Sequence, residues 1–135
     1  MTGPVEVGTE LPPLTVTFRR EDLVRYAGAS GDFNPIHWSD RVARSVELPG
    51  VIAHGMYTLA LAARALDTWA GGPGHVGELG SKFTKPVVVP DDDTGVEVVV
   101  RGTVTNVTDA GVQVALEVTC GGEKVLGRPQ AVLRA

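Results

Sequence analysis

The run from Met56 to Trp69, MYTLALAARALDTW, constrains the fold of this chain more than any other segment. Only Thr58, Arg64, Asp67 and Thr68 interrupt its apolar character. As a helix it would be about 21 Å long at a rise of about 1.5 Å per residue. A helix that is apolar on most of its circumference has to be buried, so we expect a sheet to wrap around it. Its alanines keep it narrow enough for strands or a second subunit to approach closely.

The chain after this helix alternates between apolar and polar residues and shows no further helical pattern. Val96 to Val107 and Val112 to Cys120 place apolar residues at alternate positions, which is typical of half-buried antiparallel strands. One or two further strands are expected within residues 75–89, broken around Pro86. The sequence therefore predicts an antiparallel meander whose apolar face covers the helix.

The C-terminal part of the chain predicts a hairpin. Gly121-Gly122 is the composition of a two-residue turn, and it leads into a last strand from Glu123 to Leu133. Pro129 inside that strand cannot donate a ladder hydrogen bond, which indicates a bulge or an edge position. Cys120, the only cysteine, follows the alternation of the preceding strand, so we expect a buried apolar role rather than a reactive thiol.

The N-terminal part of the chain predicts shorter elements. After a Gly- and Pro-rich leading segment, residues 1–13, Leu14 to Phe18 alternates as a short strand. Arg20 to Ala29 has apolar residues at helical spacing, and Ser39 to Val46 predicts another short helix with its first residue as the cap. The layout is α+β, and its length suits a single domain over residues 1–135.

The composition of the chain argues against several classes of protein. Its 16 Asp and Glu residues outnumber 12 Lys and Arg, and aromatic residues make up 5%, so no nucleic-acid partner is expected. No segment has the ~18 uninterrupted apolar residues of a membrane-spanning helix. The first residues lack the basic and apolar regions of a signal peptide, so we expect no membrane partner and a cytoplasmic protein.

Asp32 and His37 are the acid and histidine with a clear reason to act together. Asn34-Pro35 between them favours a turn, because Pro fixes its own φ and biases the preceding residue away from helix. Across such a turn the two side chains can converge on one point. Taken alone, Asp32 could instead be a turn or cap residue, since Asp in such a position commonly accepts hydrogen bonds from backbone amides.

The segment Ala53-His54-Gly55-Met56 leads into the long helix. The N-terminus of a helix presents free backbone N–H groups to an anion or an oxyanion. An acid and base pair followed by an oxyanion donor is the set of groups that chemistry beside a carbonyl requires. These two segments are therefore the predicted site.

Both segments carry a resemblance to a known family. YAGASGDFNPIH, Tyr26 to His37, closely matches the hydratase 2 motif of the MaoC-like dehydratases, and Ala53 to Met56 matches their second signature. Residues 82–91 are similar to a third, weaker segment. The first segment and the ending Gly122 to Arg128 also resemble the catalytic B-type subunits of mycobacterial (3R)-hydroxyacyl-ACP dehydratases. The resemblance implies the hotdog fold, a curved antiparallel sheet wrapped around a long central helix.

The resemblance also implies an activity, the reversible syn conversion of (3R)-hydroxyacyl thioesters of CoA or acyl carrier protein to trans-2-enoyl thioesters and water. Dehydration takes a proton from C2 and gives one to the departing C3 hydroxyl, so two proton carriers are needed. A histidine, which titrates near neutrality, and a carboxylate meet that requirement, which makes Asp32 and His37 the expected catalytic residues. Which of them takes the C2 proton stays open. The Gly55 N–H would face the developing enolate oxygen.

Other polar residues near these motifs have different expected roles. Asn34 should support the loop through its amide, and His54 should be a hydrogen-bonding residue at the start of the helix rather than a second base. His75 follows a Gly-rich break and is expected at the surface. Three histidines without an i, i+4 pair or clustered carboxylates make a poor metal signature, so we expect no metal and no other cofactor.

Two other functions are compatible with a hotdog fold. A thioesterase of this fold generally has a carboxylate on or beside the central helix; residues 56–66 offer none, and Asp67 comes too late. A non-catalytic acyl-binding subunit would need neither Asp32 nor His37. One departure from the family is Ala63, where some monofunctional hydratases carry a serine that the mycobacterial B-type subunits also lack.

The expected working unit is a homodimer, or a heterodimer with a sister hotdog subunit. An apolar helix and open strand edges leave surface that a lone chain covers poorly. Relatives of this kind pair their sheets edge to edge, with the acyl tunnel along the boundary. Lys82, Lys85, Arg101 and Arg128 could supply a positive mouth for CoA phosphates or an acidic carrier protein.

Overall fold

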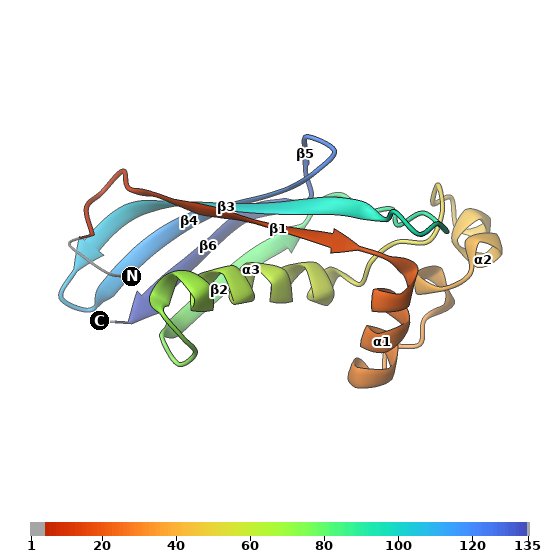
Figure 1. Cartoon of the computed structure of the whole chain (residues 1–135), viewed down its shortest axis with the longest axis horizontal. Coiled ribbons are helices and arrows are strands. Elements are labelled where there is room, and N and C mark those ends of the chain that lie inside the picture. The colour runs from red at the N-terminus through yellow and green to blue at the C-terminus, as the bar shows by residue number, and fades with distance from the viewer. Residues whose placement is uncertain (1–4, 135) are drawn as a thin grey trace.

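The computed structural model of the chain describes residues 5–134. Within them a six-stranded antiparallel sheet curves over one long helix, α3 (Gly55–Ala70), as Figure 1 shows. The strand order is β1-β3-β4-β6-β2, and the short β5 pairs with β4 beside this path. A curved antiparallel sheet around a central helix is the hotdog arrangement, so the predicted α+β fold is confirmed.

The helices and strands lie close to where the sequence placed them. In chain order they are β1 (Glu10–Phe18), α1 (Arg20–Ser30), the short 3-10 helix η1 (Pro35–His37), α2 (Asp40–Ser45), α3 (Gly55–Ala70), β2 (Val76–Phe83), β3 (Val96–Thr108), β4 (Gly111–Cys120), β5 (Glu123–Lys124) and β6 (Leu126–Arg134). Most ends differ from the prediction by one or two residues. Larger differences occur at the two strands that contain proline and within residues 75–89, where one strand, β2, ends at Phe83 and Val88 forms only an isolated bridge with Ile52.

The first strand is longer than predicted. β1 begins at Glu10, and its pairing with β3 shifts register between Leu11 and Leu14, where Pro12 and Pro13 supply no N–H. Assigning residues 10–13 to the leading segment was therefore wrong, because a strand can pass through prolines at a local irregularity. Residues 1–4 of that segment lie outside the described part of the chain.

The last predicted strand is divided. The regular strand is interrupted at Val125, which separates β5 from β6. Pro129 lies in β6, between β4 and β2, so the edge alternative was wrong. The bulge alternative is confirmed, because the register of β6 against β2 shifts at Arg128 and Pro129, and Arg128 adopts a left-handed φ of 47°.

The predicted glycine turn is confirmed. Gly121 and Gly122 have φ values of 60° and 79°, and β4 pairs with β5 on either side of them. A hairpin turn with positive φ at both central residues matches the twist of the strands and favours glycine.

The helix α3 is buried on most of its surface. Its exposed residues are Met56, Ala60, Arg64 and Thr68, which follow one another at intervals of four and form a single stripe. The opposite side, with Ala62, Ala65 and Leu66 completely buried, packs against valines of β3 and β4. The expectation of a helix covered by a sheet is therefore confirmed. Among the described residues, no helix is both long and apolar enough to cross a membrane.

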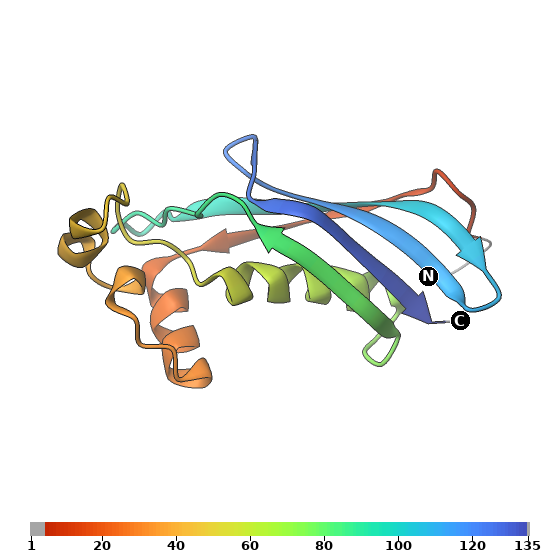
Figure 2. The ribbon, with the colours of Figure 1, turned by 180° about the vertical axis from the view of Figure 1, so that it is seen from behind.

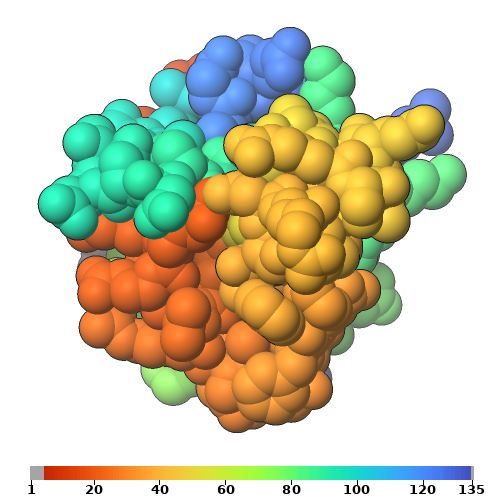
Figure 3. Space-filling model, turned by 90° about the vertical axis from the view of Figure 1, so that its right-hand side faces the viewer, coloured from red at the N-terminus to blue at the C-terminus, as the bar shows by residue number. Residues whose placement is uncertain are grey.

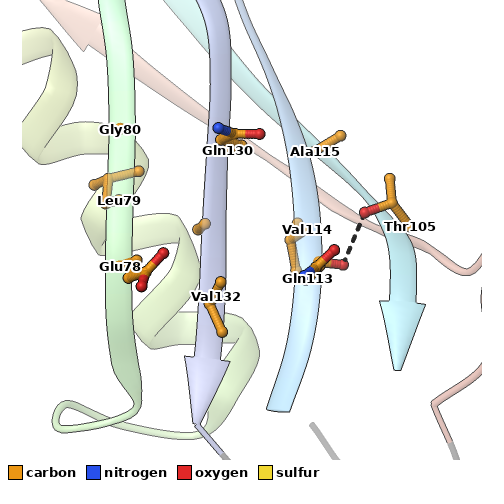
Figure 4. A pocket seen from close by; sticks show the side chains of 10 residues that line it. Glu78, Leu79, Gly80, Thr105, Gln113, Val114, Ala115, Gln130 and Val132 are labelled. Carbon is orange, nitrogen blue, oxygen red and sulfur yellow. Dashed lines mark hydrogen bonds between the residues drawn. The ribbon is translucent and has the colours of Figure 1, made fainter. Parts of the chain in front are cut away.

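The two faces of the sheet differ in polarity. Val114 and Ala131 belong to the buried core, whereas the neighbouring Gln113 and Gln130 are exposed on the outer face. A hollow of about 420 Å³ lies on that face, and Figure 4 shows these glutamines and Glu78 among the side chains that line it. The sheet thus follows the alternation predicted from its sequence.

The segments that carry the predicted site gather at the end of the molecule where α3 begins. Figure 3 views this end, with α1 and the following loop in orange, α2 in gold and the segment near residue 90 in teal. Figure 2 shows from behind that β2 runs along the edge of the sheet beside α3. The site therefore lies where the first helix, the central helix and the far edge of the sheet come together.

Candidate active site

A chain of short backbone turns builds the loop after α1. The helix ends at Gly31, whose φ is 76° and whose N–H donates to the carbonyl of Ala27 at 2.9 Å. Asp32 Oδ1 then accepts from the Asn34 N–H at 3.2 Å, and Asn34 Oδ1 accepts from the Ile36 N–H at 3.2 Å. The predicted turn is confirmed, and each Asx side chain holds the backbone two residues on.

Asp32 therefore has the turn contact that its simpler interpretation required, and a second oxygen that the turn does not use. Asp32 Oδ2 lies 3.9 Å from His37 Nε2, too far for a direct hydrogen bond. The Asp32 side chain is 51% exposed, whereas that of His37 is 8% exposed. Asp32 is thus open to solvent, whereas His37 is enclosed by the protein.

A single backbone carbonyl sets the state of His37. Its Nδ1 lies 2.7 Å from the carbonyl oxygen of Ile52, and because a carbonyl only accepts, Nδ1 carries the proton. In the neutral ring, Nε2 then has the free lone pair. This lone pair, on the ring nitrogen nearest to Asp32, allows His37 to accept a proton.

His54, the residue before α3, lies against both of these residues. Its ring stacks on that of His37, with centroids 3.8 Å apart and planes 21° apart. Its Nε2 donates to the backbone carbonyl of Asp32 at 3.1 Å. Burial, reinforced by the neighbouring His37, lowers the pKa of His54, although the bond to Asp32 opposes this shift. The expected hydrogen-bonding role of His54 agrees with this geometry.

A cavity of about 310 Å³ adjoins the pair and reaches the start of α3. Its lining includes His37, Gly55 and Thr58, together with the apolar residues Leu48, Ile52, Ala53, Phe83, Pro86, Val87, Val125 and Leu126. The Gly55 N–H donates no hydrogen bond to any residue between 5 and 134. A Cβ at Gly55 would come within 3.0 Å of the Phe83 ring, so only glycine fits here without a shift. The structure thus places Gly55 and His37 on one cavity, with Asp32 beside them and exposed Asn34 in the supporting turn.

Comparison with known proteins agrees with this arrangement. The family model described as MaoC like domain matches residues 4–121. The chain belongs to this family. The 3-hydroxyacyl-thioester dehydratase X of Mycobacterium tuberculosis is 36% identical over 89 residues, which are 64% of this chain and 31% of that protein.

Solved structures share the fold of nearly the whole chain. One described as MaoC-like dehydratase has a TM-score of 0.92 at 35% identity, over 96% of this chain and 40% of its own. The R-hydratase PhaJ1 from Pseudomonas aeruginosa has a TM-score of 0.83 at 30% identity, over 97% of this chain and 82% of its own. The chain spans 2%, 4% and 31% of three of its curated relatives, which are much longer proteins.

A partly buried ion pair lies next to the segment that holds His37. Arg20 Nη2 lies 2.9 and 3.0 Å from the two carboxylate oxygens of Asp40, and Arg20 Nε donates to the carbonyl of Val89 at 2.7 Å. Asp40 Oδ1 also accepts from the Val51 N–H at 3.0 Å, next to the Ile52 carbonyl that holds His37. The bond from Val51, with those from Arg20, lowers the pKa of Asp40.

Sequence reasoning missed these supporting residues. Arg20 and Asp40 sit in ordinary helix-start positions, and no spacing rule links a helix residue to a carboxylate on the next helix. Thr58 is buried and lines the cavity. In the sequence it is visible only as a polar residue that interrupts an apolar helix.

Ala63, the departure from the family pattern, is not among the residues that line this cavity. His75 is exposed, as predicted.

The same cluster raises the question of a metal. Asp32, His37 and His54 each offer a ligand atom, and these atoms lie within 4.8 Å of one another. The lone pairs of an imidazole lie in the plane of its ring, and two stacked rings cannot direct them at one ion placed about 2.0–2.1 Å from each nitrogen. One nitrogen of each histidine is already a donor to a carbonyl. The arrangement therefore fits proton chemistry better than metal ligation, and the absence of a metal stays a prediction.

Proposed function

We propose that this chain catalyses the reversible syn hydration of trans-2-enoyl thioesters to (3R)-hydroxyacyl thioesters. The observation that supports it most is the separation of 3.9 Å between His37 Nε2 and Asp32 Oδ2, beside a cavity that also exposes the Gly55 N–H. The names of the dehydratase and R-hydratase relatives, and their family, support the same reaction.

The two polar groups suit the two proton movements of the reaction. In hydration, the oxygen of a water adds to C3 and C2 gains a proton, while the proton that the water loses must be accepted. His37 Nε2 has its lone pair toward Asp32, so a water between them can reach both side chains. Because both groups approach from one side, the hydroxyl and the C2 proton add to the same face of the double bond.

The start of α3 supplies the third part of the reaction. Addition to C3 moves negative charge onto the thioester oxygen, and a backbone N–H without another partner stabilises it there. Gly55 offers such a donor, and the positive end of the α3 dipole lies at the same point. The apolar walls beyond it hold the acyl chain, and Lys85 on the same wall is the one member of the expected basic mouth that lines the cavity.

The proposed working unit is a dimer with a second hotdog chain. The exposed stripe of α3 and the edge strands β1 and β2 are the surfaces that such a partner would cover. Asp32, 51% exposed in a single chain, would gain a drier surrounding from that cover.

Crotonyl-CoA tests the proposed reaction directly. We expect the ultraviolet absorbance of its conjugated enoyl thioester to fall without release of free thiol, and chiral analysis to identify (3R)-hydroxybutyryl-CoA. Release of free thiol would identify a thioesterase instead, and no change with any chain length or carrier would identify a non-catalytic subunit. A (3S) product would contradict the hydratase 2 assignment whatever its rate.

A further inference from the structure

We propose that His54 is a positioning residue that holds Asp32 and His37 at their working separation. This inference rests on the proposed hydratase reaction, in which those two residues carry the protons. It assigns to His54 a task in catalysis without contact with the substrate.

The ring of His54 contacts both members of the proposed pair. The His54 ring stacks on His37 at 3.8 Å, and its Nε2 donates to the Asp32 backbone carbonyl at 3.1 Å. Asp32 is otherwise held by contacts inside its own turn, with Ser30 and Asn34. His54 is therefore the residue that joins the Asp32 turn to the His37 ring.

His54 is itself rigidly held. It is 2% exposed and directly precedes α3, the helix whose buried residues belong to the core. The edge of Tyr26, from α1, meets its ring at a centroid distance of 4.8 Å. Because His54 is buried at the start of α3, its hydrogen bond to Asp32 fixes the exposed loop relative to the core.

The unused nitrogen of His54 decides which histidine takes up a proton. His54 Nδ1 is buried and has no hydrogen-bond partner among the described residues. A proton there would create a buried imidazolium with a donor that no acceptor meets, which is costly. The titratable groups around the ring are Asp32 on the preceding loop, His37 on η1 and Tyr26 on α1, with Tyr57 of α3 beyond Tyr26.

Two charged imidazoles stacked 3.8 Å apart would repel each other, so at most one of the pair is charged at a time. His37 Nε2 faces the Asp32 carboxylate, and His54 Nδ1 faces no acceptor. Of the two histidines, His37 is therefore the one that takes part in proton transfer, while His54 stays neutral, and burial of His54 favours the same state.

Substitution of His54 separates its two contacts. His54→Phe keeps a ring to stack on His37 and removes the donor to Asp32, whereas His54→Gln keeps an N–H donor and removes the ring. We expect His54→Phe to lower kcat for crotonyl-CoA by roughly 10- to 100-fold with KM within about threefold, because displacement of a reacting group by ~1 Å costs on that order. His54→Gln should recover kcat to within about fivefold of the unchanged protein.

His75→Phe is the matched control, since His75 is exposed and its side chain has no part in this cluster. It should leave kcat unchanged. An unaltered kcat in folded His54→Phe would overturn the inference, and so would an equal loss in His54→Phe and His54→Gln at unchanged Tm.

The unsubstituted protein offers a second measurement that requires no variant. Long-range proton–nitrogen spectra of the imidazole rings should show His54 as the neutral form protonated at Nε2 between about pH 5.5 and 8.5, the range in which a histidine charge is informative. A second proton on His54 in that range, or a proton on Nδ1 alone, would overturn the inference even if no variant folds. A chain that shows these ring states but hydrates no enoyl thioester would instead contradict the proposed function.

Discussion

At the scale of single residues, acceptor atoms distinguish two histidines that lie side by side. The Ile52 carbonyl holds the proton of His37 on Nδ1 and leaves Nε2 free toward Asp32. The Asp32 carbonyl holds the proton of His54 on Nε2 and leaves Nδ1 buried without a partner. Two residues of one chemical type therefore have different functions because the backbone presents its carbonyls to different ring nitrogens.

The proposed proton carriers give the first prediction. Asp32→Asn and His37→Ala should each lower the hydratase kcat by at least ~10²-fold, the usual contribution of a positioned acid or base. The double variant should lose little more than the worse single variant, because groups that act as a unit are non-additive.

Crotonyl-CoA turnover checks this prediction, with circular dichroism to confirm that each variant is folded. Near-normal turnover in either folded variant would remove that residue from the proposed mechanism. Exposed His75→Ala serves as the matched control and should retain full activity.

The support of the site gives a prediction on pH. The bonds from Val51 and Arg20 lower the pKa of Asp40 in the folded protein. A lowered folded-state pKa stabilises the protein above the unfolded-state value and loses this effect as the pH falls through the folded-state value. Asp40→Asn should therefore lower Tm at pH 7 by on the order of 5 °C, and the difference should shrink below about pH 4.

Thermal unfolding across pH measures that difference. The matched control is Asp109→Asn, because Asp109 is exposed in the turn between β3 and β4 and the described residues give it no ion pair. A Tm gap for Asp40→Asn that is constant from pH 7 to pH 3 would contradict the assignment of its stabilising charge.

At the scale of elements, α3 is matched to the sheet by small and large residues in complementary places. Ala62 and Ala65 of the helix lie against the sheet, and the large ring of Trp69 lies against Gly102 of β3. Trp69 Nε1 donates to the Pro12 carbonyl at 2.7 Å, so the ring is held by β1 at the same time. The helix end is therefore fixed between two strands.

This packing predicts the effect of one methyl group. A Cβ at Gly102 would come within 2.8 Å of the Trp69 ring, which its hydrogen bond holds in place. Gly102→Ala should therefore destabilise the fold by about 1–3 kcal/mol, the usual result of overpacking.

Gly80→Ala on β2 is the control, because a Cβ there has no heavy atom within 4 Å. It should leave the free energy of unfolding unchanged or raise it slightly. Urea denaturation of both variants measures the difference, and equal stability of the two would show that the Trp69 ring gives way.

At the scale of the whole molecule, one chain leaves apolar surface around the site uncovered. The side chains of Phe33, Trp38, Met56 and Phe83 are 63%, 54%, 57% and 58% exposed. Among residues 5–134, β1 and β2 are the two edge strands of the sheet. Exposed apolar side chains near unpaired strand edges indicate an interface.

The proposed dimer is tested by light scattering at micromolar concentration. We expect roughly 28 kDa for a homodimer, twice the 14.1 kDa of one chain. A monomer of about 14 kDa with low activity that rises when a sister hotdog chain is added would identify a heterodimer. A monomer with full hydratase activity would contradict the requirement for a partner.

The sequence by itself determined most of the fold. The hydrophobic period of each helix and strand can be read from its own residues. An apolar helix followed by alternating strands then has few ways to bury its surface other than a sheet wrapped around the helix. It also determined the turn that brings Asp32 near His37, since Asn34 and Pro35 act on neighbouring dihedral angles. The single-domain prediction and the catalytic roles remain to be tested.

Only the tertiary structure decided the rest. The Ile52 carbonyl that orients His37, the pair of Arg20 with Asp40 and the stacking of His54 all join segments far apart along the chain. The choice between bulge and edge for Pro129 depended on which strand came to lie beside β6. Local sequence patterns determine dihedral preferences and burial. The partners of a side chain depend on how distant elements pack, and the protonation states of His37 and His54 depend on those partners.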